Sequence, residues 1–280
     1  MMARDATLAV LFPGQGSQTS DMRDRVQEDR PDLLALARDQ VGADPFELAD
    51  EGTRWAQPAI FCASLAGWKR LDDGEAAVMA GHSLGEISAL VAAGALSERD
   101  GLLLVAERGR LMQEAAAAAG GGGMLAALGD ERGAVDEVAR RLGLTVANDN
   151  APSQVVLSGE SGALDAAASE LKEHGVRTRR LAVRGAFHSP AMEPAVAPFR
   201  EVLEEIEVKE PRVPVLSGVT AEPFDDIRLR LSQAIAHPVR WLDVMRAMAA
   251  RGARRFVEVG PGKVLTGLVR RTLEGVEARA

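Results

Sequence analysis

Short apolar runs alternate with helical patterns along the chain. Residues 7–12 (TLAVLF) form a continuous apolar run, which is typical of a parallel strand buried on both faces, and shorter runs occur at 76–80 and 256–259. Apolar residues at helical spacing predict helices over 31–41, 58–71, 86–93 and 98–119. The last of these carries a buried stripe of Leu102, Val105, Ala106, Gly109 and Met112. Strands that alternate with helices favour an α/β domain built around a parallel sheet.

Four consecutive glycines at 120–123 interrupt this pattern and predict a flexible boundary. Beyond them we expect strands and helices in the order βαββαβ, at 124–128, 131–142, 144–148, 154–158, 161–175 and 176–183. That order is typical of a ferredoxin-like unit. The sequence therefore predicts a large α/β-hydrolase-like domain with a parallel sheet, formed by residues 1–122 and 186–280. Residues 123–185 are predicted to form an inserted small ferredoxin-like (βαββαβ) subdomain.

Composition indicates an ordinary globular protein. Of the 280 residues, 46% are hydrophobic and 26% are charged. The apolar runs are too short to span a membrane, and Met1–Asp5 lacks the apolar stretch of a signal peptide. Cys62 is the single cysteine, so an internal disulfide is excluded, and we expect it to be a small core residue in a cytoplasmic protein.

The formal net charge of −8 argues against a general nucleic-acid binder. Arginine and lysine are nevertheless unevenly distributed. They gather in two stretches, Arg177, Arg179, Arg180 and Arg184, and Arg251, Arg254, Arg255, Lys263, Arg270 and Arg271. Each cluster is either an ordinary solvated face or a docking patch for an acidic partner or a phosphorylated ligand.

Residues 81–85, GHSLG, are the most informative motif. They match G-x-S-x-G, in which a serine is lifted out of a sharp strand-to-helix turn. The predicted strand at 76–80 and the predicted helix from 86 supply the required context. Free backbone N–H groups at the start of that helix would face an oxygen that becomes negative beside Ser83. The motif therefore predicts acyl transfer, with an ordinary tight turn as the alternative.

A serine hydroxyl needs a neighbouring base, and the chain has four histidines. His82 adjoins Ser83, but consecutive residues of such a turn point in different directions. His174 precedes a glycine at a helix end, where a helix-capping residue is expected. His237 precedes a proline, which favours a turn. His188 lies where the predicted insert rejoins the main domain, at the mouth of an interdomain cleft, and we expect it to be the base.

Further motifs accompany the elbow, which has the extended form GHSLGE at 81–86. They are FPGQGSQ at 12–18, QPA at 57–59, ERGRLMQ at 107–113, NDNAPSQ at 148–154, FHSP at 187–190, PVRW at 238–241 and EVGPGK at 258–263. Together they cover nearly the whole chain. With them the sequence resembles the malonyl-CoA:acyl-carrier-protein transacylases and the acyltransferase domains of polyketide synthases.

This resemblance implies roles for individual residues. Ser83 would be the nucleophile and His188 its base, while the backbone N–H groups of Gln15 and Leu84 would form an oxyanion hole. Such donors contribute about 3–4 kcal/mol each to transition-state stabilisation. Arg108 would hold the free carboxylate of a malonyl group in a bidentate pair.

The resemblance also describes the surrounding pocket. Gln57 and Asn150 would line the space for the acyl group and pantetheine, and Phe187 resembles the polyketide-type pattern associated with malonyl rather than branched units. A main-chain carbonyl would orient the catalytic histidine. Family members usually carry glutamine four residues before the proline of PVRW, where this chain has Ala234 and places Gln233 one residue earlier. The owner of that carbonyl is therefore open.

The implied reaction is ping-pong transfer of malonyl from malonyl-CoA to the phosphopantetheine thiol of an acidic acyl carrier protein. No metal or other cofactor is expected, and family members are usually monomers. A discrete acyltransferase of polyketide synthesis and the transacylase subunit of a malonate decarboxylase share this chemistry and differ in the receiving carrier. A serine esterase would place an acid between serine and histidine and has little use for Arg108. A carrier-binding scaffold with a dead site is disfavoured by the intact Ser83, His188 and Arg108.

Overall fold

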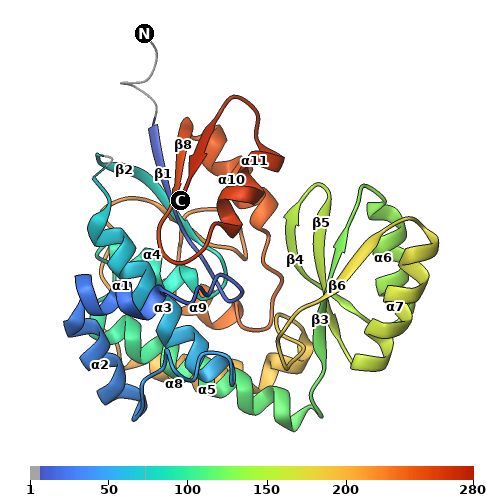
Figure 1. Cartoon of the computed structure of the whole chain (residues 1–280), viewed down its shortest axis with the longest axis horizontal. Coiled ribbons are helices and arrows are strands. Elements are labelled where there is room, and N and C mark those ends of the chain that lie inside the picture. The colour runs from blue at the N-terminus through green and yellow to red at the C-terminus, as the bar shows by residue number, and fades with distance from the viewer. Residues whose placement is uncertain (1–6, 73) are drawn as a thin grey trace.

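The computed structural model describes residues 7–72 and 74–280, so Met1–Asp5 lies outside the described part. Two separate sheets organise the chain (Figure 1). The larger sheet is parallel throughout, with the order β7-β2-β1-β8-β9. Its strands are β1 (Thr7–Phe12), β2 (Ala76–Gly81), β7 (Val215–Leu216), β8 (Ala253–Glu258) and β9 (Glu277–Arg279). The predicted parallel sheet is confirmed.

The register of the two central strands places the functional loops. Phe12 at the end of β1 pairs with Gly81 at the end of β2. Because both strands are parallel, the loop after β1 and the turn after β2 leave the sheet at the same edge. Ligands of open α/β sheets bind at this edge, outside the carboxyl ends of the strands.

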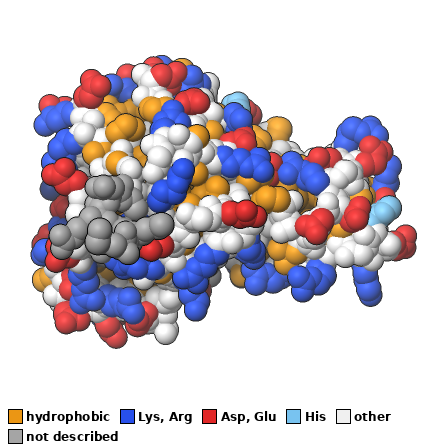
Figure 2. All heavy atoms as spheres, turned by 90° about the horizontal axis from the view of Figure 1, so that it is seen from above, with side chains coloured by type: hydrophobic (Ala, Val, Ile, Leu, Met, Phe, Trp, Pro, Cys, Tyr) orange, Lys and Arg blue, Asp and Glu red, His pale blue; other side chains and the backbone are white. Residues whose placement is uncertain are grey.

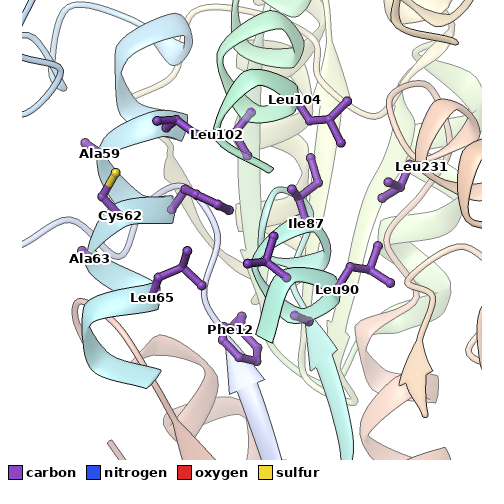
Figure 3. Packing of buried hydrophobic residues seen from close by; sticks show 14 of the residues in the cluster. Phe12, Ala59, Cys62, Ala63, Leu65, Ile87, Leu90, Leu102, Leu104 and Leu231 are labelled. Atoms are coloured by element: carbon purple, nitrogen blue, oxygen red, sulfur yellow. The ribbon is translucent and has the colours of Figure 1, made fainter. Parts of the chain in front are cut away.

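Helices cover the parallel sheet. They are α1 (Met22–Asp29), α2 (Pro31–Val41), α3 (Thr53–Arg70), α4 (Gly85–Ala92), α5 (Glu98–Ala118), α8 (Glu193–Glu204), α9 (Ile227–Gln233), α10 (Trp241–Ala250) and α11 (Val264–Thr272), with a 3₁₀ turn at Pro190–Met192. Figure 3 shows Phe12, Cys62, Ile87 and Leu102 among the side chains buried between α3, α4, α5 and the sheet. Cys62 is fully buried there, and burial raises the pKa of its thiol to about 12, as expected of a core residue.

The start of α3 was predicted wrongly. Pro58 suggests a first-turn position, but the helix begins at Thr53 and Pro58 lies inside it. The neighbouring helix explains the difference, since a Cβ on Gly109 of α5 would lie 2.8 Å from the Thr53 carbonyl oxygen. This close approach of α5 packs the additional turn against the core.

The smaller sheet is antiparallel, with the order β4-β5-β3-β6. Its strands are β3 (Gly123–Leu128), β4 (Thr145–Ala151), β5 (Gln154–Gly159) and β6 (Arg177–Arg180), joined through α6 (Arg132–Arg141) and α7 (Ser161–Glu173). Figure 1 shows both helices on the side of this sheet that faces away from the parallel sheet. The βαββαβ order and the pairing match the predicted ferredoxin-like unit.

The chain enters the small sheet through Gly120, Gly121 and Gly122, whose φ angles of 79°, 97° and 102° favour glycine. The exact division at 122/123 and 185/186 stays a prediction. Figure 2 shows a broad part and a narrower part, with acidic and basic side chains interspersed over this face. Within the described residues, no helix is both long and apolar enough to cross a membrane.

Candidate active site

The turn between β2 and α4 holds Ser83 in a strained backbone conformation, with φ of 55°. Two glycines make this turn possible. A Cβ on Gly81 would lie 1.8 Å from the backbone carbon of Gly85, and a Cβ on Gly85 would lie 2.2 Å from the Phe12 carbonyl oxygen. Any other residue at either position would collide with backbone. The GHSLG motif is therefore a steric requirement of the turn that presents Ser83.

His188 contacts the serine directly. Its Nε2 lies 2.8 Å from Ser83 Oγ, and its Nδ1 lies 2.9 Å from the Ala234 carbonyl oxygen and 3.2 Å from that of His237. A carbonyl oxygen can only accept, so the neutral ring carries its proton on Nδ1. Nε2 is then free to accept the serine proton. The main-chain carbonyl of Ala234 thus contacts the ring, and this contact does not depend on the side chain at position 234.

The environment keeps His188 uncharged. Burial, followed by the positive charge of Arg108 and the proximity of His82, lowers the pKa of His188 to about 3. The ring is therefore uncharged throughout the neutral range, with a proton on Nδ1 and none on Nε2. His188 also has a positive φ, 56°, so the two residues in contact are both held in the left-handed region. Backbone strain of this kind is concentrated at functional sites.

Arg108 of α5 completes the group. Its side chain is buried (3% exposed), and it donates to Ser83 Oγ at 3.0 Å and to Gln57 Oε1 at 2.9 Å. Gln57 in turn donates to Thr53, whose hydroxyl donates to Gln15 Oε1. Across residues 7–72 and 74–280, no carboxylate lies within 4 Å of this guanidinium. Burial lowers the pKa of Arg108 to about 10, which still leaves it charged at neutral pH.

A buried cation with only neutral partners is costly unless an anion binds to it. A second buried charge, Glu86 in the first turn of α4, accepts a hydrogen bond from the Gly218 N–H at 2.6 Å and makes no ion pair with Arg108. Ser83 is thus surrounded by a neutral imidazole and by a buried guanidinium that has no carboxylate partner in the described chain.

Backbone donors also face this region. Leu84 lies at the start of α4, and Gln15 belongs to the loop after β1. Neither backbone N–H donates to an acceptor among the described residues. The loop and the elbow are close, since a Cβ on Gly14 would lie 2.5 Å from the His82 carbonyl oxygen. An oxyanion hole is built from unpaired backbone donors of this kind.

The remaining histidines have other partners. His82 Nε2 lies 2.8 Å from Asn150 Oδ1 on β4, and its ring lies 5.4 Å from that of Trp241. His174 is the residue that ends α7, as its sequence context suggests. The contact between His82 and Asn150 ties the small sheet to the elbow.

A cavity of about 910 Å³ lies between the two parts of the chain. Its lining includes Gln15, His82 and Phe187, and from the small sheet Asn150 and Arg179. Ser83, Arg108 and His188 are not among the lining residues; Arg108 and His188 are buried, and Ser83 is half-buried. The cavity therefore leads to the neighbours of the three reactive side chains.

The structure brings the predicted residues together as follows. Ser83, His188, Arg108 and Gln57 form one hydrogen-bonded chain, while Asn150 and Phe187 lie on the cavity wall. Sequence reasoning missed Thr53, which has no motif, and the carbonyl of Ala234, which has no side-chain signature. Within the described residues, no cluster of three histidine, cysteine, aspartate or glutamate side chains could hold a metal ion.

Comparison with known families decides the class of this site. Residues 47–279 match the family model described as acyl transferase domain. The chain belongs to this family. The resemblance inferred from the motifs is confirmed, and the enzyme is an acyltransferase rather than the alternative serine esterase.

Relatives of this acyltransferase differ in length. The polyketide biosynthesis protein ThaF of Burkholderia thailandensis is 40% identical over 281 residues, and the match covers 95% of this chain but 24% of that protein. The malonyl CoA-acyl carrier protein transacylase of Bacillus subtilis is 38% identical over 285 residues, with 94% of this chain and 90% of that protein covered.

Solved structures agree with the fold. The malonyl-CoA:acyl carrier protein transacylase of Xanthomonas oryzae has a TM-score of 0.90 and 39% identity, covering 98% of this chain and 94% of that chain. A malonyl-transacylase solved in complex with its type II polyketide acyl-carrier protein has a TM-score of 0.88 and 35% identity, covering 97% and 94%.

Proposed function

We propose that this acyltransferase moves a malonyl group from malonyl-CoA to the phosphopantetheine thiol of an acyl carrier protein. The observation that carries the proposal is the buried guanidinium of Arg108, 3.0 Å from Ser83 Oγ and without a carboxylate partner in the described chain. A malonyl group has its carboxylate a few bonds from the thioester carbonyl, so a group bound to Arg108 would present that carbonyl to Ser83. The names of the relatives point to the same substrate.

The proposed reaction has two halves. The malonyl carboxylate replaces Ser83 Oγ as a partner of Arg108, and His188 Nε2 accepts the serine proton while Oγ attacks the thioester carbonyl. The oxyanion is held by the N–H groups of Gln15 and Leu84. The imidazolium, stabilised by the carbonyl of Ala234, returns its proton to the leaving thiolate.

The second half reverses these steps with the carrier thiol as nucleophile, and the ester of malonate with the serine is the intermediate. We expect the enzyme to work as a monomer and without a cofactor, since every step uses side-chain and backbone groups of this chain.

The covalent intermediate gives a direct test. Intact-protein mass is measured after brief exposure to malonyl-CoA, for the wild type and for Ser83→Ala. We expect a malonyl adduct only on the wild type, discharged when holo-carrier protein is added. An adduct on Ser83→Ala as well would contradict the assignment of the nucleophile. Free malonate without an adduct would indicate a hydrolase, and neither product would indicate a binding scaffold.

Basic side chains border the cavity and offer a docking surface to an acidic carrier. Arg179, Arg180 and Arg184 line it on the side of the small sheet, and Val264, 46% exposed, lines it on the side of the parallel sheet. We propose that these arginines attract the carrier while its pantetheine arm enters the cavity. The malonyl-transacylase complex is precedent for a carrier bound to a relative with this fold.

Charge reversal separates this role from binding of CoA phosphates. Arg179→Glu combined with Arg184→Glu should raise KM for the holo-carrier by about tenfold, because rim charges mainly affect association. Arg177→Glu is the control, since Arg177 is exposed on the same strand but does not line the cavity. Malonylation of Ser83 by malonyl-CoA should be unchanged. An equal decrease in the rates of Ser83 malonylation and of transfer to the carrier would indicate that the arginines bind CoA instead.

A further inference from the structure

Two buried charges flank Ser83 without forming an ion pair. Glu86 is 2% exposed and Arg108 is 3% exposed. No guanidinium nitrogen of Arg108 lies within 4 Å of a carboxylate oxygen of Glu86. A neutral group, the Gly218 N–H, donates to the Glu86 carboxylate at 2.6 Å. The positive charge of Arg108 still lowers the pKa of Glu86, so the two groups interact through the interior.

No other charge faces Glu86 from the elements that pack against α4. β1, β2 and β7 carry no titratable side chain. From α5 the facing group is Arg108, and the remaining acidic and basic side chains of α5 are half-buried or exposed. From α3 the buried titratable group is Cys62, which is an uncharged thiol. Burial lowers the pKa values of His82 and His188, so both rings are neutral. The groups that face one another around Glu86 therefore carry one positive charge, on Arg108, and one negative charge, on Glu86.

We propose that Glu86 takes up a proton from solvent when the malonyl carboxylate binds to Arg108. The inference rests on the proposed function. A substrate carboxylate paired with Arg108 would leave Glu86 as an uncompensated anion in a site of low dielectric constant, which is strongly unfavourable. A proton on the Glu86 carboxyl restores neutrality. No bond of the thioester changes in this step, and the proton returns to solvent when the malonyl group leaves.

The sign of the effect follows from the surroundings of Glu86. Burial raises the pKa of its carboxyl to about 7, and Arg108 opposes that rise. The single negative charge of a bound carboxylate cancels the influence of Arg108, so the pKa must move further up. Malonyl-CoA should therefore bind more tightly as the pH falls from 8 towards 7. Acetyl-CoA, which has no carboxylate, should bind without this dependence.

Calorimetry measures the proton directly. Ser83→Ala protein, which cannot be acylated at this position, is titrated with malonyl-CoA at about pH 7.5. The titration is done in phosphate and in Tris, two buffers with different ionisation enthalpies. We expect uptake of roughly half a proton or more, because Glu86 is mostly ionised at that pH before binding and mostly protonated after it. Acetyl-CoA should give no uptake. The double variant Ser83→Ala, Glu86→Gln should bind malonyl-CoA without uptake, since the amide oxygen can still accept from Gly218.

The outcomes separate this inference from the function on which it rests. Binding of malonyl-CoA without uptake, or unchanged uptake in the Glu86→Gln variant, overturns the role of Glu86 and leaves malonyl transfer standing. Failure of the folded protein to bind malonyl-CoA refutes both. Where the double variant does not fold, infrared difference spectra of Ser83→Ala protein decide. A protonated carboxyl band that appears with malonyl-CoA and shifts in ¹³C-glutamate-labelled protein supports the proposal, and its absence refutes it.

Discussion

Replacing Arg108 with alanine tests the carboxylate receptor most sharply. The substitution removes a guanidinium that is 3% exposed and that lies 3.0 Å from Ser83 Oγ. A substrate carboxylate at this position would form a desolvated, charge-assisted pair, and truncating one partner of such a pair costs about 2–5 kcal/mol. At about 1.4 kcal/mol for each factor of ten, kcat/KM for malonyl-CoA should fall roughly 30- to 5,000-fold.

Acetyl-CoA provides the internal comparison. It has no free carboxylate, so with this substrate the variant loses only the hydrogen bonds from Arg108 to Ser83 and Gln57, each about 1 kcal/mol or some fivefold. The assay measures initial rates of transfer from each CoA ester to holo-carrier protein, for the wild type and the variant. The ratio of the two kcat/KM values cancels any general disturbance of Ser83.

A matched control lies two residues further along α5. Arg110 is 38% exposed and pairs with Glu107 and Glu114 on the helix surface, so Arg110→Ala should change both rates less than about twofold. Arg108→Lys keeps the charge but loses the planar fork, and its ratio should lie between those of the wild type and Arg108→Ala. An equal loss for both substrates in Arg108→Ala would refute the receptor.

Three further predictions follow from the geometry around the elbow. Gly85→Ala should abolish the malonyl adduct and lower the thermal midpoint, because its Cβ would lie 2.2 Å from the Phe12 carbonyl oxygen; an active, stable variant would contradict this packing. Ala234→Ser should keep kcat within about threefold of the wild type, since the carbonyl rather than the side chain contacts His188. A decrease in kcat of about tenfold would instead indicate that the side chain makes the contact. The pKa of His188 is lowered to about 3 when folded, whereas the unfolded chain binds this proton near 6.5. Stability should therefore fall as the pH drops from 6.5 towards 3, by at most about 5 kcal/mol from this ring. Urea unfolding at several pH values measures this decrease in the free energy of unfolding. An equal dependence on pH in His188→Gln would assign the decrease to other groups.

The sequence predicts those features that depend on local sterics or on strong periodicity. The elbow was predictable because only glycine fits at 81 and 85, and the buried stripe of α5 because its apolar residues recur at helical spacing. The carbonyl of Ala234 was not predictable, since every residue has one and only the tertiary fold selects it. The early start of α3 was missed for a similar reason, because packing against Gly109 overrides the preference of Pro58 for a first turn. Sequence reasoning predicted no helix after residue 186, although α8, α10 and α11 are amphipathic.

The order of the strands in the parallel sheet bears on how the enzyme is made. β1, the earliest strand, lies between β2 and β8, and β8 is completed only at Glu258. While the chain emerges from the ribosome, β1 therefore lacks one of its two neighbouring strands until residue 258 has been synthesised. The carbonyl of Ala234 that orients His188 also appears late. Ser83 is thus exposed on a nascent chain well before it has a base or a complete sheet beneath it, and long-range pairing of this kind slows folding. Reactivity towards thioesters should arise only when β8 has paired with β1 and the segment that carries Ala234 has packed against His188.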